Sequence, residues 1–177
     1  MKSLLNSVLG IFDVKLVRKS SRFRDYELSS LINEKYFLDY FTNLQFSKSQ
    51  LRQDLFVLSE LGFKENGFFI EFGATNGVDL SNTHILETRF KWNGVLAEPA
   101  KIWHHALMEN RSVAIETDCV WRETGETLLF NEVNDEKHDG ELSTIDSFTN
   151  VDHHAKSRKS ASNKYEVKTI SLADMLK

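Results

Sequence analysis

Two short apolar runs flank a helical pattern in the middle of the chain. Residues 68–72 read FFIEF and residues 94–97 read GVLA, which have the length and composition of buried parallel strands. Between them, Ile85, Leu86 and Phe90 recur at the spacing of one helix face. Strand, helix and strand in this order predict an α/β unit with two parallel strands.

A glycine-containing turn separates the first predicted strand from the helix. Two glycines within five residues predict a tight turn whose backbone can approach a ligand closely. Asp79 or Ser81 can cap the helix that follows, and the free N–H groups and positive dipole end of that helix then face the same place. The turn consists of Gly73, Ala74, Thr75, Asn76 and Gly77.

An acidic residue, Glu98, ends the second predicted strand. It follows the glycine turn by about twenty residues, the separation at which nucleotide-binding folds carry the acid that binds the ribose. A carboxylate in that position can accept hydrogen bonds from both ribose hydroxyls. The turn and the acid together predict a site for an adenosine-containing ligand.

Two residues distinguish between adenosine-containing ligands. The dinucleotide fingerprint G-x-G-x-x-G has a central glycine where this chain has Thr75, which leaves a pyrophosphate less room. Glu71, just before the turn, would repel a pyrophosphate but suits a ligand with a positive amino group. A nicotinamide-dependent oxidoreductase is therefore disfavoured, although binding of NADH would revive it.

The pattern E-x-G-x-x-x-G, followed by an acid after the next strand, resembles S-adenosylmethionine-dependent methyltransferases. More narrowly, FFIEFGATNGVDLSNTHILE at residues 68–87 and GVLAEPA at residues 94–100 resemble the FkbM family of methyltransferases. The resemblance extends over residues 49–177. It implies a Rossmann-like class I methyltransferase fold, S-adenosyl-L-methionine as cofactor, and O-methylation of a hydroxyl on a small-molecule or glycan acceptor, such as a sugar or a secondary metabolite.

The resemblance also implies roles for individual residues. The ribose would meet Glu98, the adenine amino group Asp118, and an adenine ring nitrogen the backbone N–H of Cys119. Asn82 would meet the carboxylate end of the cofactor, and no general base is identified. The residues expected around the methionine part are Glu71, Gly73, Ala74, Asn76 and Gly77.

A segment before the turn, SQLRQDLFV at residues 49–57, is also similar to the family. If it is helical, Gln50 and Asp54 lie four residues apart on one face and approach the cofactor or the acceptor. A helix face that meets only solvent is the alternative left open.

We expect two parts in the chain. Residues 1–66 form a helical extension that packs on the core, and residues 67–177 form a partial Rossmann-like domain that is truncated after its third strand.

The third strand, residues 112–117, leads into Asp118 and Cys119. A polar insert at about residues 131–164 has no sustained pattern, as in a lid or a disordered loop. Further strands are expected at residues 127–130 and 165–170, and a last helix is expected to start at Ser171. In the family, another strand follows that helix, so the sequence is either a fragment or a natural short form.

Composition limits the partners and the compartment. The net charge of −4 gives no argument for nucleic-acid binding, and a single cysteine in 177 residues favours a reducing cytoplasm. No run is long enough to span a bilayer. Adjacent His104 and His105 point in different directions on a helix, so no metal site is expected.

The first residues of the chain differ from the rest. Residues 1–24 carry six lysines and arginines against one acid, beside an apolar stripe. A basic amphipathic helix of this kind either contacts an anionic membrane surface or docks on the domain. An unpaired edge of the partial sheet would also favour a homo-oligomer. The alternative to the enzyme is therefore a non-catalytic half-domain that acts as a binding or membrane-peripheral interaction module.

Overall fold

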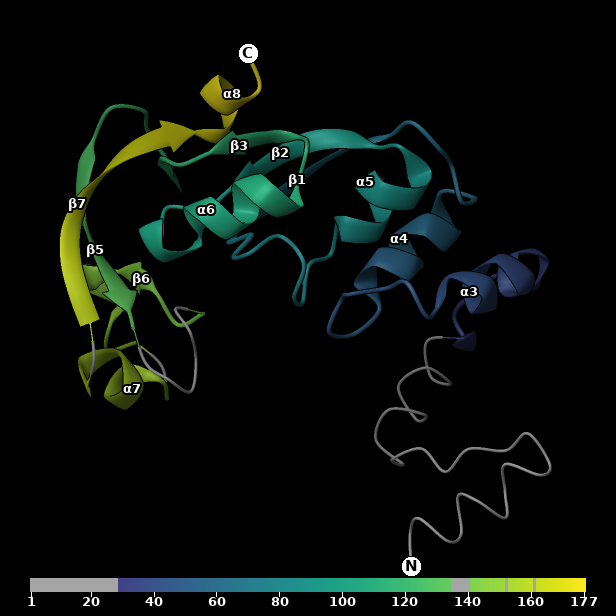
Figure 1. Cartoon of the computed structure of the whole chain (residues 1–177), viewed down its shortest axis with the longest axis horizontal. Helices are drawn as coiled ribbons and strands as arrows, with labels where there is room; N and C mark the ends of the chain where they lie inside the picture. The colour runs from purple at the N-terminus through teal and green to yellow at the C-terminus, as the bar shows by residue number, and fades with distance from the viewer. Residues whose placement is uncertain (1–28, 135–140, 152, 161) are drawn as a thin grey trace, which may run out of the picture.

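The computed structural model describes residues 29–134, 141–151, 153–160 and 162–177 (Figure 1). The predicted basic amphipathic helix at residues 1–24 lies outside the described residues. Among the helices of the described part, none combines the length and the apolar character that crossing a bilayer requires.

The first sheet has three parallel strands in the order β1-β2-β3. Helix α5 connects β1 to β2, and helix α6 connects β2 to β3. The predicted strand–helix–strand unit is therefore confirmed, with Ile70 of β1 opposite Val95 of β2. The elements are β1 (Phe68–Phe72), α5 (His84–Phe90), β2 (Asn93–Ala97), α6 (Lys101–Asn110) and β3 (Ala114–Glu116).

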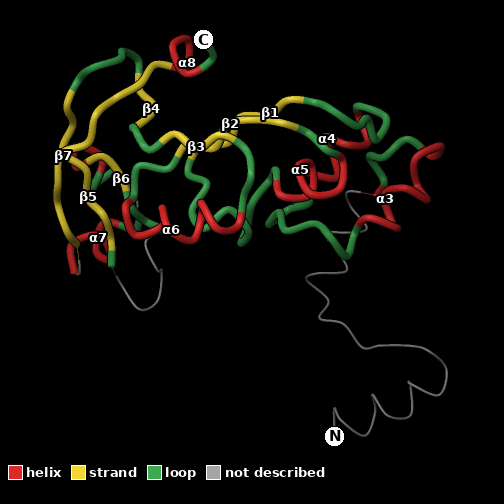
Figure 2. Tube along the Cα trace, turned by 45° about the horizontal axis from the view of Figure 1, so that its top comes forward, coloured by secondary structure: helices red, strands yellow, loops and turns green. Residues whose placement is uncertain are grey.

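Helices cover one face of this sheet (Figures 1 and 2). Side chains alternate between the two faces of a strand, so Phe69 turns to the helices and is buried, whereas Phe68 and Phe72 are 55% and 53% exposed. The main core lies between the sheet and the helices and includes Leu55, Leu58, Ile85, Leu86, Leu96 and Leu107. The helices before β1 are η1 (Glu34–Tyr36), α3 (Phe37–Asn43) and α4 (Gln53–Glu60).

A second sheet curls at the other end of the molecule, with strand order β4-β7-β5-β6 (Figure 2). Strand β4 is parallel to β7, whereas β7 pairs with β5, and β5 with β6, in antiparallel fashion. A parallel sheet with crossover helices and a second, mixed sheet confirm the α/β class. The elements are β4 (Cys119–Trp121), β5 (Thr127–Val133), β6 (Thr144–Ile145), η2 (Asp146–Phe148), α7 (Ala155–Ser160), β7 (Ser162–Ser171) and α8 (Leu172–Met175).

The second sheet corrects two expectations. The polar stretch at residues 131–164 is not a structureless loop, because it contains the end of β5, β6, η2, α7 and the start of β7. Some of its polar residues are buried, among them Asn131 and Thr149, and Asn131 Nδ2 donates to Thr149 Oγ1 at 3.1 Å. The third strand also ends earlier than expected, at Glu116, and Cys119 begins a separate strand that pairs with β7.

The strands predicted at residues 127–130 and 165–170 are confirmed and are longer than expected, because they pair with each other along β5 and β7. The last helix begins as predicted, with the Ser171 hydroxyl accepting from the backbone N–H of Asp174.

Contacts between Tyr165 of β7, Glu132 of β5 and the start of α6 join the two sheets. The Tyr165 hydroxyl donates to Glu132 Oε2 at 2.7 Å and accepts from the backbone N–H of Lys101 at 3.0 Å. Glu132 Oε2 also accepts from the backbone N–H of Ile102 at 3.1 Å. Burial and the adjacent carboxylate raise the pKa of Tyr165, which keeps the hydroxyl protonated as the donor.

Candidate functional site

Two adjacent cavities lie where the strands of the parallel sheet end. The larger has a volume of about 510 Å³ and is walled by the end of the first sheet and by β4 and β5 of the second. The smaller, of about 290 Å³, lies beside the segment between β1 and α5. Their sizes suit a small organic ligand. Both are lined by Phe72, Gly73, Thr75 and Glu141.

The glycine turn after β1 contributes Gly73 and Thr75 to the walls of both cavities. The backbone N–H groups of Gly73 and Ala74 donate to the carbonyl oxygen of Ala97, at 2.8 and 3.3 Å, which ties the turn to the end of β2. Gly73 and Gly77 have φ angles of 67° and 78°, in the left-handed region that glycine adopts without strain. The glycines are therefore placed by backbone geometry, as the sequence predicted.

Glu98 is 4% exposed at the end of β2, on the wall of the larger cavity. Its Oε2 accepts from the backbone N–H of Thr75 at 2.9 Å, and its Oε1 accepts from that of Ala100 at 2.8 Å. Burial raises the pKa of this carboxyl group, against the opposing effect of the two backbone donors. Each carboxylate oxygen has a second acceptor position, so Glu98 can also accept from ligand hydroxyls.

Glu71, expected at the amino-acid end of the cofactor, lies at the smaller cavity and also bonds to the loop after the turn. Its carboxylate lines the smaller cavity but already accepts from Ser81 Oγ at 2.9 Å, from the Asn82 backbone N–H at 2.8 Å and from Thr83 Oγ1 at 2.6 Å. The N-cap residue of α5 is Thr83 rather than the predicted Asp79 or Ser81, but the Ser81 hydroxyl accepts from the backbone N–H groups of Thr83 and His84, at 3.2 and 3.1 Å. Glu71 thus fixes the loop that forms the wall of the smaller cavity.

Arg111, whose role was not predicted from the sequence, also holds the loop between β1 and α5. Its side chain is fully buried, and Nη1 donates to the carbonyl oxygen of Gly77 at 2.9 Å. Nη2 donates to Thr83 Oγ1 at 2.9 Å, and Nε pairs with Glu87. The same guanidinium lies 4.0 Å from Glu71. Nothing in the sequence indicates that Arg111 supports this loop. Arginines are common at the C-terminal ends of helices, where their charge is favourable in any case.

The remaining residues expected around the methionine part separate into two groups. Ala74 and Asn82 line the smaller cavity, and Asn82 Oδ1 accepts from Ser49 Oγ at 2.8 Å. Asn76 and Gly77 line neither cavity, and Asn76 Oδ1 accepts from the backbone N–H groups of Val78 and Asp79, both at 2.9 Å. Asn76 therefore shapes the turn rather than the cavity surface.

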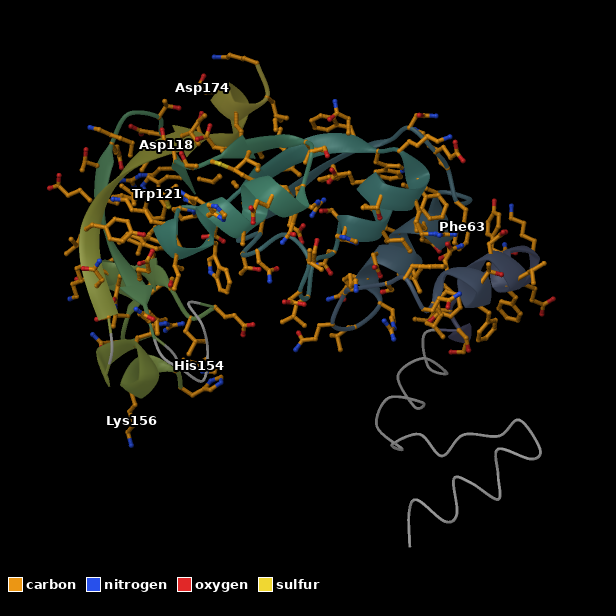
Figure 3. The ribbon with its side chains drawn as sticks, viewed as in Figure 1. Phe63, Asp118, Trp121, His154, Lys156 and Asp174 are labelled. Atoms are coloured by element: carbon orange, nitrogen blue, oxygen red, sulfur yellow. The ribbon has the colours of Figure 1, made fainter. Side chains whose placement is uncertain are left out.

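At the expected adenine end, Cys119 lines the larger cavity, whereas Asp118 is not among its lining residues. Figure 3 shows Asp118 and Trp121 at the end of the molecule that holds the second sheet. Trp121 also lines the cavity and packs against Phe148, with ring centroids 6.2 Å apart. Burial raises the pKa of the Cys119 thiol, which keeps it protonated and apolar.

The expectation for Gln50 and Asp54 rests on a helix face that does not exist. Helix α4 begins at Gln53, so Gln50 precedes it, and neither residue lines a cavity. Asp54 is 1% exposed, and its Oδ1 accepts from Ser47 Oγ at 2.7 Å and from the Leu55 backbone N–H at 2.8 Å. Burial raises its pKa.

The comparisons with known proteins assign no relatives to this chain: no protein-family model, no curated protein and no solved structure matches it. Within the described residues, no group of three or more histidine, cysteine, aspartate or glutamate side chains is placed to hold a metal ion. The site must therefore be interpreted from its own chemistry: a glycine turn, one buried carboxylate and aromatic side chains in the cavity wall.

Proposed function

We propose that the chain is an S-adenosylmethionine-dependent methyltransferase of the FkbM kind, with a Rossmann-like domain. The observation that carries the proposal is the meeting of three features at one cavity. The glycine turn, the buried carboxylate of Glu98 and the aromatic wall of β4 all border the larger cavity, at the carboxyl ends of parallel strands. This is where open α/β sheets bind nucleotide ligands.

The residues present suit an adenosyl ligand. Glu98 has free acceptor positions for two ribose hydroxyls, and Trp121 and Phe130 supply apolar surface for a ring beside Cys119. The smaller cavity, with Ala74 and Asn82, would take the amino-acid end. The cofactor would supply an activated methyl group, so the protein has to orient an acceptor hydroxyl and exclude water. As acceptor we propose a hydroxyl of a sugar or secondary metabolite.

Calorimetric titration with S-adenosylhomocysteine tests the proposal without an acceptor. The parent should bind in the micromolar range, and Glu98→Ala should lose about 1–3 kcal/mol of binding free energy, because ribose hydroxyls lose their acceptor. Glu98→Ala also leaves the backbone N–H groups of Thr75 and Ala100 without their acceptor, which could disturb the fold. Glu98→Gln, which retains one acceptor oxygen, is therefore the second variant. Glu123→Gln, an exposed residue outside both cavities, is the control.

Thermal unfolding of each protein must accompany the titration. A folded parent that binds no S-adenosylhomocysteine would contradict the proposal. Binding of NADH in its place would favour the nicotinamide-dependent oxidoreductase instead.

One observation favours a second candidate function, a non-catalytic interaction module. Large apolar side chains along α3 and α4 and just before η1 remain exposed, with Leu38 of α3 at 80%, Phe41 of α3 at 53% and Leu31 at 66%. Exposed apolar clusters often mark contact surfaces for proteins or membranes. A folded chain that binds neither S-adenosylhomocysteine nor NADH, but associates with itself or with anionic vesicles, would support this module. Association with vesicles would also support a membrane-peripheral location.

A further inference from the structure

The two cavities share a short boundary, and only one residue on it carries a charge. Of the four residues that line both cavities, Phe72, Gly73 and Thr75 are neutral, and Glu141 is a carboxylate. Glu141 comes shortly before β6 in the chain, and it lines both cavities together with Gly73 and Thr75 of the glycine turn. A charge placed at this boundary acts on whatever part of a ligand passes from one cavity to the other.

The other carboxylates that line the cavities are already engaged by donors of the protein. Glu71 accepts three hydrogen bonds, Glu98 accepts two from the backbone, and Asp79 accepts from Asn76 Nδ2 at 2.8 Å. Glu141, in contrast, makes no hydrogen bond or ion pair with any other residue that the structure describes. Its charge is therefore available to a ligand.

The neighbouring arginine does not cancel that charge. Arg122 lines the larger cavity, but its guanidinium lies 3.9 Å from Glu126 and its side chain is 74% exposed. Aromatic side chains lie in the same walls, because Phe72 lines both cavities and Trp121 lines the larger one. A positive centre there would be attracted by the carboxylate and would also meet the negative face of an aromatic ring.

We propose that Glu141 determines specificity for the charged state of the ligand, favouring a sulfonium over a neutral thioether. The inference rests on the proposed function. In S-adenosylmethionine the sulfonium joins the adenosyl group to the amino-acid chain. With the adenosyl group in the larger cavity and the amino acid in the smaller, that sulfur passes the boundary where Glu141 lies. The residue thus holds the substrate form more tightly than the demethylated product, which promotes product release.

Titrations of the parent and Glu141→Gln with two ligands test this inference. S-adenosylmethionine and S-adenosylhomocysteine differ by one methyl group and one positive charge, so the ratio of their dissociation constants reports the charge preference. In Glu141→Gln, S-adenosylmethionine should bind about 1.4- to 5-fold more weakly, the range for an exposed charge pair, while S-adenosylhomocysteine is unchanged. The effect should shrink at high salt because mobile ions screen it. Glu123→Gln should change neither constant.

Each other outcome contradicts the inference. Equal weakening of both ligands in Glu141→Gln would mean that the residue contacts a shared part or shapes the cavity. Unchanged binding of both would mean that its charge is not near the sulfur. If the folded parent binds neither ligand, the proposed function fails and this inference fails with it. If Glu141→Gln binds both ligands as the parent does, only the charge role of Glu141 is overturned.

Discussion

Nη1 of Arg111 donates a hydrogen bond to the carbonyl oxygen of Gly77 at 2.9 Å, across a separation of 34 residues in the sequence. A buried side chain from the end of α6 thus supports the glycine turn of the candidate site from the side away from the cavities. The same guanidinium reaches Thr83 and Glu87, so the turn, the loop after it and α5 are joined through one group.

Replacing Arg111 should therefore cost more stability than replacing an exposed arginine. Arg111→Met leaves the largely buried carboxylates of Glu87 and Glu71 without their positive partner, and we expect a loss of about 3–5 kcal/mol in the free energy of unfolding. Arg111→Lys keeps the charge but not the fork of donors, and should lose less. Urea denaturation measures both. Arg122→Met, at an exposed ion pair, should lose at most about 1 kcal/mol, and an equal loss at both positions would contradict the assignment.

Three glycines with positive φ allow backbone strain to be separated from steric contact. A Cβ at Gly125 or Gly73 would meet no atom within 4 Å, so alanine there should cost only the left-handed backbone, about 1–2 kcal/mol. A Cβ at Gly77 would lie 2.6 Å from Arg111 Cγ and 2.7 Å from Leu107 Cδ1. Gly77→Ala should therefore lose about 1–3 kcal/mol more than Gly125→Ala in the free energy of unfolding.

The same series separates stability from ligand binding. Gly73 lines both cavities, so the new methyl group of Gly73→Ala would project where a ligand lies. Gly73→Ala should match Gly125→Ala in denaturation but bind S-adenosylhomocysteine more weakly in a titration. Equal affinity of the two variants would show that the ligand does not reach the turn.

The first sheet could be predicted because its signals are local. Apolar runs of strand length, helical spacing between them, and glycines at a turn are visible within a few neighbouring residues. The turn and Glu98, which meet at the larger cavity, belong to the same unit and were found in the same way.

The second sheet and part of the site could not be predicted, because they depend on distant partners. Asn131 and Glu132 resemble loop residues in the sequence, yet both are buried in the folded chain, where Asn131 Nδ2 donates to Thr149 and Glu132 Oε2 accepts from Tyr165. Arg111 and Glu141 likewise gain their positions from the folded chain, one behind the turn and one across the cavity boundary. Periodicity reports none of these pairings.

Tyr165 offers a test of the contact between the sheets. Tyr165→Phe removes the donor to Glu132 and the acceptor for the backbone N–H of Lys101, and should lower the free energy of unfolding by about 1–2 kcal/mol. The matched control is Tyr36→Phe, whose hydroxyl makes no hydrogen bond with another described residue. Equal losses in chemical denaturation would indicate that the Tyr165 hydroxyl does not hold the sheets together.

The raised pKa of Glu98 predicts opposite pH dependences for stability and for ligand binding. In the folded chain without ligand, the carboxyl group binds a proton more readily than in the unfolded chain, whose ordinary value is 4.5. Between that value and the raised pKa, the folded state carries more protons, so the contribution of Glu98 to stability increases as the pH falls. In the proposed complex, ribose hydroxyls would donate to the ionised form, so the affinity for S-adenosylhomocysteine should decrease as the pH falls over the same window.

The comparison with Glu98→Gln isolates this group from others that titrate, such as Asp54, whose pKa is also raised by burial. The difference between parent and variant in the free energy of unfolding should move in favour of the parent as the pH falls, and the difference in binding free energy should move against it. Denaturation and titration across the same pH series measure the two. Protonation makes the burial of Glu98 less costly, but the proton must leave before the carboxylate can accept the ligand's hydroxyls. If both differences moved in the same direction, the ionised Glu98 carboxylate would therefore not be the group that accepts those hydroxyls.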